Sequence, residues 1–504
     1  MTSKGDHRTW TGKQAGLIGI VILMLAGFCF GQPAVSLSPK DGPPTTILRV
    51  SGSGFTPYAQ IDIYFDTQDQ ALAVANAAGA FSQVAIQAPK SAVSGSHWVT
   101  AAERSGRIVK QEVFEVQVNW TEFHTKDMRR ENPYENVLNV DNVGSLQMLW
   151  GYQTGGAVDS SPAVVDGVVY IGSGDHTLYA LDAGTGALLR MGGLGSTGDS
   201  PFAVANGMAY FGSGDSNVYA LKAHTGKRLW TYHTGGRVWS PPTVANGVVY
   251  VDSLDSNVYA LNASTGALQW KYTTTPGQYV NTSPAVTNGV VYVGGGDGYV
   301  YALQASTGDL LWKDFFGGGG YMYSSPAVAN GVVYVGSDNH SVYALNARTG
   351  VQLWRYATGD DADSSPAVAN GVVYIGSHDG NLYALDASTG AELWSYRTGG
   401  FVACSPAVAN GVVYVGSYDG NVYVLNASTG TLLWSYQTGN SYSSPAVVNG
   451  VVYIGSDDGH VYAFGLPKEL APQPPKRPDP KTLRPDFNLK VSVSQTIAIR
   501  AGTD

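Results

Sequence analysis

The strongest constraint on the fold of this chain is a sequence unit of about forty residues that recurs from residue 150 to residue 464. The unit runs Trp, Thr-Gly, Ser-Ser-Pro-Ala-Val, Asn-Gly, Val-Val-Tyr, Asp-Gly, Val-Tyr-Ala-Leu and Ala-Ser-Thr-Gly before it returns to Trp. Arg190 takes the tryptophan position of one unit. Successive units begin 40 or 42 residues apart at Trp230, Trp270, Trp312, Trp354, Trp394 and Trp434, and Trp150 opens the series. A fixed period of this length is typical of repeat architectures.

Each unit predicts four short antiparallel strands. In one unit, residues 365–368 and 372–376 alternate as strands around Asn370-Gly371, and an Asn-Gly pair favours a two-residue hairpin because both positions need positive φ. Two further strands follow, separated by Gly-containing turns. Four strands per unit over eight units predict an all-β chain with an eight-bladed β-propeller over residues 146–466.

The ends of the repeat array predict how the ring closes. The last unit stops at Phe464, without the tryptophan-bearing fourth strand. Residues 146–152, which precede the first unit, have the pattern of that missing strand. We therefore expect this segment to complete the eighth blade and to remove an open sheet edge.

The N-terminus has the pattern of an export signal. Lys4, Arg8 and Lys13 precede an uncharged apolar stretch over residues 15–30, which is short for a membrane span. We interpret residues 1–31 as a signal peptide, with an uncleaved N-terminal anchor or lipidation at Cys29 as alternatives. The mature protein is then exported and is periplasmic, cell-surface or secreted, and Cys404 has no disulfide partner in the chain.

Three further segments flank the ring. Residues 35–118 contain short period-two strands such as residues 61–65, and they predict an immunoglobulin-like β-sandwich. Residues 119–145 are interpreted as a connector that wraps onto the ring. Residues 467–504 form a proline-rich tail that opens as a stiff, solvated linker, with a possible strand at residues 491–499. A net charge of −9 argues against a nucleic-acid partner, and we expect a monomer.

The segment Ala387-Ser388-Thr389-Gly390-x-x-x-Trp394 resembles the tryptophan-docking repeat of quinoprotein dehydrogenases, the pyrroloquinoline quinone (PQQ) enzymes, and of PQQ-binding-like propellers generally. The scaffold lipoprotein of the outer-membrane barrel-assembly machinery is another relative of such propellers. Residues 35–118 resemble bacterial Ig-like modules through Gly52-x-Gly54-Phe55. The resemblance implies that a tryptophan packs between neighbouring blades, and that the junction at Arg190 is weaker. The implied docking residues are Trp150, Trp230, Trp270, Trp312, Trp354, Trp394 and Trp434.

The resemblance also implies a calcium ion beside the quinone, held by Glu, Asn and Asp oxygens. Glu392 is the single glutamate between Trp150 and Phe464, and it belongs to an outer strand. Neither an adjacent cysteine pair nor a Cys-x-x-Cys-His haem motif occurs. We therefore expect no catalytic residue, no metal and no cofactor, with PQQ and calcium as the alternative. The repeated aspartates of the Asp-Gly turn and the repeated serines are interpreted as structural, and Cys404 as a small buried thiol.

Variation between the repeats points to one face of the ring. The Asn-Gly and Ala-Ser-Thr-Gly turns share a face and hardly vary, whereas the opposite face changes from unit to unit and is rich in aromatic residues. The predicted binding residues there are Asp159, Arg237, Trp239, Tyr279, Asn281, Tyr321, Tyr323, Asp363, Phe401 and Tyr442. The sequence thus favours a non-catalytic cell-envelope scaffold that binds a protein or glycan. A PQQ- and calcium-dependent alcohol or sugar dehydrogenase and an outer-membrane assembly scaffold are the alternatives.

Overall fold

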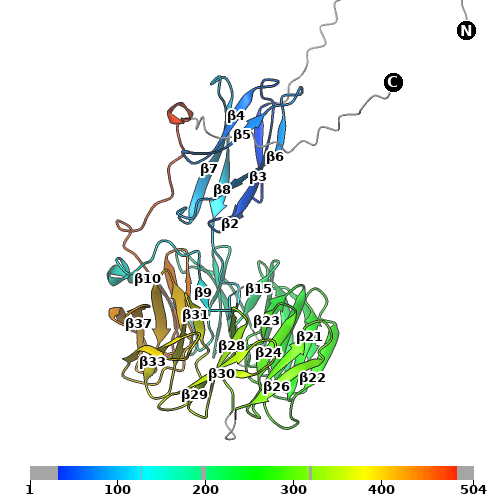
Figure 1. The fold of residues 1–504 in the computed structure, drawn as a ribbon, viewed down its shortest axis with the longest axis vertical. Coiled ribbons are helices and arrows are strands. Elements are labelled where there is room, and N and C mark those ends of the chain that lie inside the picture. Colours follow the sequence, from blue (N-terminus) through cyan, green and yellow to red (C-terminus); the bar gives the residue numbers. More distant parts are fainter. Residues whose placement is uncertain (1–31, 126–127, 194–199, 317–320, 485–504) are drawn as a thin grey trace, which may run out of the picture.

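The computed structural model describes residues 32–484 except 126–127, 194–199 and 317–320. The chain is almost entirely β-structure: an N-terminal pair of sheets lies above one face of a ring of sheets (Figure 1). The predicted signal peptide and the possible strand at 491–499 lie outside the described residues. In the part that is described, no helix is long and apolar enough to cross a membrane.

The N-terminal part contains two sheets that enclose a core of its own. One has the order β1-β3-β6, and the other has the order β2-β8-β7-β4-β5. Leu48, Ile63, Val99 and Phe114 are fully buried between them. The strands are β1 (Ala34–Ser38), β2 (Asp41–Gly42), β3 (Ile47–Ser53), β4 (Gln60–Phe65), β5 (Gln68–Val74), β6 (Phe81–Gln87), β7 (Gly95–Glu103) and β8 (Val109–Val116).

The ring contains eight sheets, each built on four antiparallel strands in meander order, and the seventh has a fifth strand, β9 (Glu131–Asn132), which pairs parallel to β35. We number the sheets along the chain. The first comprises β11 (Ala163–Val165), β12 (Val168–Ser173), β13 (Thr177–Asp182) and β14 (Leu188–Gly193); the second β15 (Ala203–Ala205), β16 (Met208–Gly212), β17 (Asn217–Lys222) and β18 (Arg228–His233). The third comprises β19 (Thr243–Ala245), β20 (Val248–Ser253), β21 (Asn257–Asn262) and β22 (Leu268–Thr273); the fourth β23 (Ala285–Thr287), β24 (Val290–Gly294), β25 (Tyr299–Gln304) and β26 (Leu310–Phe315).

The same pattern continues through the remaining sheets. The fifth comprises β27 (Ala327–Ala329), β28 (Val332–Ser337), β29 (Ser341–Asn346) and β30 (Gln352–Ala357); the sixth β31 (Ala367–Ala369), β32 (Val372–Gly376), β33 (Asn381–Asp386) and β34 (Glu392–Arg397). The seventh comprises β35 (Ala407–Ala409), β36 (Val412–Gly416), β37 (Asn421–Asn426) and β38 (Leu432–Gln437). The eighth comprises β39 (Ala446–Val448), β40 (Val451–Gly455), β41 (His460–Gly465) and β10 (Gln147–Gln153).

The eighth sheet joins the two ends of the repeat array. Its outer strand β10 pairs antiparallel with β41, with Gly151 opposite Tyr462, which is the closure that the sequence predicts. The innermost strands of successive sheets contact one another around the ring, and β39 returns to contact β11. Both termini of the ring are therefore held in one sheet, and no outer strand is left without its neighbour.

Local sequence explains the hairpins. Asn370 and Gly371 have φ of 50° and 79°, so they form the two-residue turn between β31 and β32 that the Asn-Gly pair predicts. The Asp of the Asp-Gly turn accepts a hydrogen bond from a tyrosine hydroxyl four residues later, for example Tyr383 to Asp379 at 2.6 Å. Each such aspartate stabilises the turn in which it lies, which supports a structural role for these residues.

A tryptophan on the outer strand of each sheet except the first docks onto the next sheet. Trp354 on β30 is 7% exposed, and its Nε1 donates a hydrogen bond of 3.0 Å to the Ala387 carbonyl in the sixth sheet. A Cβ on Gly390 would lie 2.7 Å from the indole, so glycine is required where the ring lies flat on the turn. Equivalent bonds of 2.8–3.0 Å are made by Trp150, Trp230, Trp270, Trp312, Trp394 and Trp434.

The connector enters the ring instead of only wrapping its surface. Between Trp120 and Asn132, which ends the short strand β9 (Glu131–Asn132), it makes a hydrogen bond to the innermost segment of every sheet in turn. The partners are Val164, Val204, Val244, Ser283, Val328, Val368, Val408 and Val447. A segment that touches all eight inner edges in order must run around the inside of the ring. A 3₁₀ turn at Val143–Ser145 then leads into β10.

The tail differs from its prediction as a solvated linker. Residues 472–484 return to the N-terminal sheets, where the Arg477 guanidinium lies 4.8 Å from the Trp98 ring centroid. Arg477 also donates a hydrogen bond of 2.6 Å to Gln111, and a short 3₁₀ turn follows at Pro480–Thr482. The tail therefore packs on β7 and β8, because its cation and prolines find an aromatic surface there.

Candidate recognition face

The loops that vary between repeats gather on the face of the ring that points away from the N-terminal sheets. Ser94 and Val118 contact Asn449 in the β39–β40 turn, so the N-terminal part sits on the conserved Asn-Gly side. The variable loops occupy the opposite ends of the same strands. We call the surface formed by residues 157–159, 237–239, 279–281, 321–323, 338, 360–363, 378, 401, 418, 442 and 457 the recognition face.

Large aromatic side chains are exposed on the recognition face. Seven of them are between 37% and 55% accessible: Trp239, Tyr279, Tyr321, Tyr323, Phe401, Tyr418 and Tyr442. Clusters of solvent-exposed aromatic rings are more common at binding surfaces than on the rest of a protein surface. Six of the ten predicted residues are among these exposed aromatic side chains, whereas Asp159 and Asp363 are only partly exposed.

Three of these rings form a continuous arc with His378 over the sixth to eighth sheets. His378 stacks on Phe401 with ring centroids 5.1 Å apart, and Phe401 stacks on Tyr418 at 6.3 Å. Tyr418 continues to Tyr442 at 5.1 Å. Elsewhere on the face, Tyr321 and Tyr323 lie 6.0 Å apart, and the Arg237 guanidinium lies 5.4 Å from the Trp239 centroid. Tyr279 and Asn281 make no side-chain hydrogen bond within the described residues.

Two pairs of aspartates flank the aromatic arc. Asp363 and Asp338 share a hydrogen bond, and burial together with that partner raises the pKa of Asp338 to about 8. The Nε2 atom of His378 lies 3.2 Å from the Oδ2 atom of Asp363. Burial and the neighbouring Asp457 likewise raise the pKa of Asp159 to about 7. In each pair, the second carboxyl group and the burial of the site disfavour ionisation of the first.

Sequence reasoning placed members of both pairs on this face but did not predict that they pair with each other. Asp338 was missed, although its position before the Asp-Gly-type turn of the fifth sheet is the same one that His378 and Asp457 occupy in theirs. The spacing of the histidines along the sequence does not predict a metal site. His340, Asp360 and Asp361 nevertheless lie with their ligand atoms within 4.8 Å of one another at the edge of the face.

The connector occupies the inside of the ring, next to the innermost strands of the sheets. Arg130 is fully buried, and its guanidinium donates to the carbonyls of Pro406, Ser405 and Pro445. Burial lowers the pKa of Arg130 to about 9. Its positive charge is stabilised by the carbonyl oxygens and by the ring of Phe123, whose centroid lies 4.4 Å from the guanidinium carbon. Sequence reasoning missed this residue because nothing local marks it as central.

The residues present do not fit the quinone and calcium site that the resemblance implies. Glu392 lies on the outer strand β34 and accepts a hydrogen bond from Tyr356. The aspartates nearest the centre of the recognition face are engaged with each other. Calcium requires six to eight converging oxygens, including ionised carboxylates, and the described residues of the face do not bring such a set together.

The closed ring of four-stranded sheets with interlocking tryptophans defines the protein as a β-propeller of the PQQ-like class. A family model described as outer membrane protein assembly factor BamB matches residues 190–315, 276–365 and 341–466, more than half of the chain. The chain belongs to this family of PQQ-like repeat propellers. No curated protein matches the sequence significantly.

Solved structures agree on the fold. BamB from Moraxella catarrhalis superimposes with a TM-score of 0.57 at 20% identity, covering 64% of this chain and 100% of that one. A europium-containing methanol dehydrogenase gives 0.61 at 16%, covering 69% and 98%. The quinohemoprotein alcohol dehydrogenase from Comamonas testosteroni gives 0.59 at 17%, covering 69% and 82%. The likeness extends to BamB and to dehydrogenases alike, so function must come from the site.

Proposed function

We propose that this protein is a non-catalytic, exported binding scaffold of the cell envelope. In this proposal the eight ring sheets are the blades of an eight-bladed propeller, the recognition face binds a protein or glycan, and the N-terminal sheets form an Ig-like spacer. The observation that carries the proposal is the set of seven exposed aromatic side chains gathered on the face opposite that spacer.

The absence of a fitting calcium set supports a binding role over a dehydrogenase. The connector also fills the inner end of the ring with Arg130, where its hydrogen bonds are satisfied by the ring's own carbonyls. Export is supported by the N-terminal apolar segment and by the description of the family. A membrane attachment would involve only that segment if it is not cleaved.

The test compares two triple variants of residues 32–504 on glycan arrays and in capture from an envelope extract. One variant carries Phe401→Ala, Tyr418→Ala and Tyr442→Ala on the recognition face. The matched control carries Leu311→Ala, Leu353→Ala and Leu393→Ala, which are exposed on outer strands. We expect the wild type and the control to retain a specific ligand and the aromatic variant to lose it.

Calorimetric titration of PQQ in the presence of calcium tests the alternative that the protein is a dehydrogenase. Saturable micromolar binding together with dye-linked alcohol or sugar oxidation would overturn the proposal and establish the dehydrogenase. An outer-membrane assembly scaffold is the second candidate, because the matching family carries that description. Stoichiometric co-purification with outer-membrane assembly proteins would favour it.

A further inference from the structure

The aromatic packing of the ring is interrupted at one place, between the first and second sheets. On β30 the side chains of Trp354 and Tyr356 both dock on the sixth sheet, where Tyr356 lies 5.4 Å from the Tyr383 ring. The same two positions on β14 hold Arg190 and Gly192. This junction therefore lacks both an indole and a phenol that other junctions possess.

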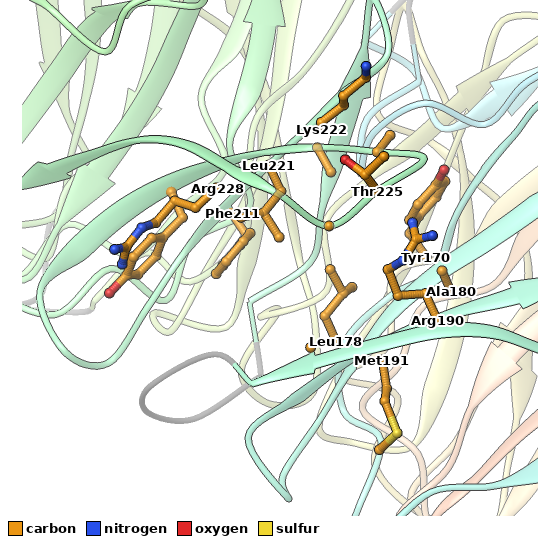
Figure 2. Close-up of a pocket in the computed structure, with 15 residues that line it drawn as sticks. Tyr170, Leu178, Ala180, Arg190, Met191, Phe211, Leu221, Lys222, Thr225 and Arg228 are labelled. Carbon is orange, nitrogen blue, oxygen red and sulfur yellow. The ribbon is translucent and has the colours of Figure 1, made fainter.

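The loss leaves a cavity of about 390 Å³, drawn in Figure 2. A Cβ added to Gly192 would meet nothing within 4 Å, which shows that the phenol position is open. The volume is within the range of about 300–1,000 Å³ that small-molecule sites occupy. One wall is apolar and includes Leu178, Phe211 and Leu221.

Polar groups that are paired at other junctions are left without their partners here. In the sixth sheet the Ala387 carbonyl accepts hydrogen bonds of 3.0 Å from both Trp354 and Tyr334. At the junction between the first and second sheets, the equivalent groups are the Ala223 carbonyl and the Tyr170 hydroxyl. Within the described residues, no hydrogen bond joins them. Both residues line the cavity.

The cavity is also positively charged, in a protein whose net charge is −9. Arg190, Lys222 and Arg228 line it, and no acidic residue does. Figure 2 shows Arg190 and Tyr170 on one side of the cavity and Arg228 on the other. Arg190 makes no ion pair or hydrogen bond with the described residues, so its guanidinium is available to a carboxylate.

We propose that this cavity binds a small planar aromatic molecule that carries a carboxylate. The Cδ atom of Arg190 lies on Gly226, where the indole lies at the other junctions, so the aromatic ring would occupy the open phenol position beside it, near Phe211 and Tyr219, whose own centroids are 5.2 Å apart. A ring N–H or O–H would donate to the Ala223 carbonyl, and the carboxylate would pair with Arg190. This site is separate from the recognition face and does not depend on its proposed function.

The experiment titrates indole-3-acetate, indole and tryptamine into the full exported chain by calorimetry. We expect indole-3-acetate to bind at least about tenfold more tightly than indole, because the pairing with arginine adds a charge-assisted bond, and tryptamine to bind least. The variant Arg190→Trp restores the residue of the other repeats, so it should abolish binding and raise the melting temperature. Arg190→Leu should keep the binding of indole but lose the preference for the carboxylate.

Several outcomes would overturn the proposal. One is that the wild type does not bind indole-3-acetate below millimolar concentration. Another is that Arg190→Trp, or Gly192→Tyr as a second way to fill the cavity, binds it as the wild type does. Equal or tighter binding of tryptamine would overturn the role of Arg190. None of these results bears on the aromatic triple variant of the recognition face.

Discussion

Replacing one docking tryptophan gives the sharpest test of what holds the ring together. Trp354→Ala removes a side chain that is 7% exposed, its hydrogen bond to Ala387 and its contact with Tyr334 at 5.8 Å. Deleting a buried Trp costs about 3–5 kcal/mol. At roughly 2 °C per kcal/mol for a unit of this size, we expect the melting temperature to fall by about 6–10 °C.

The same assay on Arg190→Ala supplies the internal comparison. Arg190 occupies the equivalent position but makes no hydrogen bond within the described residues, so its loss should cost about 1 kcal/mol or less. Trp239→Ala, on the recognition face, should also be nearly neutral, because that ring is already 37% exposed. Circular dichroism melts and urea titrations measure all three variants. Equal destabilisation by Trp354→Ala and Arg190→Ala would refute the docking argument.

Three further predictions test long-range features. Burial raises the pKa of Asp252 to about 7, so stability should fall as pH rises from about 4 to 7, and the fall should be smaller in Asp252→Asn than in the wild type; an equal fall in both proteins between pH 4 and pH 8 would contradict this. Arg130→Met leaves three buried carbonyls without donors and should cost about 2–4 kcal/mol, with faster proteolysis of the connector as the readout. Arg477→Ala should increase amide exchange in residues 472–480 while costing about 1 kcal/mol or less, and unchanged exchange would show that the cation–π contact does not hold the tail.

Much of the ring could be predicted because its determinants are local. The Asn370-Gly371 pair specifies a hairpin wherever it occurs, and the period of the unit repeats that hairpin around the ring. The missing strand after Phe464 and the surplus strand before the first unit together predicted the pairing of β10 with β41. Repetition also exposed the variable loops, because a departure from the unit is visible within one sequence.

The chemistry of the sites could be predicted only in part. Phe401 and Tyr442 were placed on the correct face, but the arc that joins them through Tyr418 depends on the spacing of neighbouring sheets. The cavity at Arg190 was expected only as a weaker junction. Its open volume arises because Arg190 and Gly192 replace the tryptophan and the tyrosine of the other junctions. The two replacements form one cavity only once β14 and β17 are packed side by side.

By itself the sequence determined the strands, the turns and the direction of closure, since each depends on residues a few positions apart or on strict repetition; the docking role of the tryptophans was implied by the family resemblance. Tertiary structure decided where the non-repeating parts go. Arg130 is buried against the segments that lead into β35 and β39, Asp338 lies beside Asp363, and the tail lies on Trp98, because packing brings distant segments together. Such contacts carry no periodic signal, and their energies come from burial and desolvation, which exist only once the chain has folded.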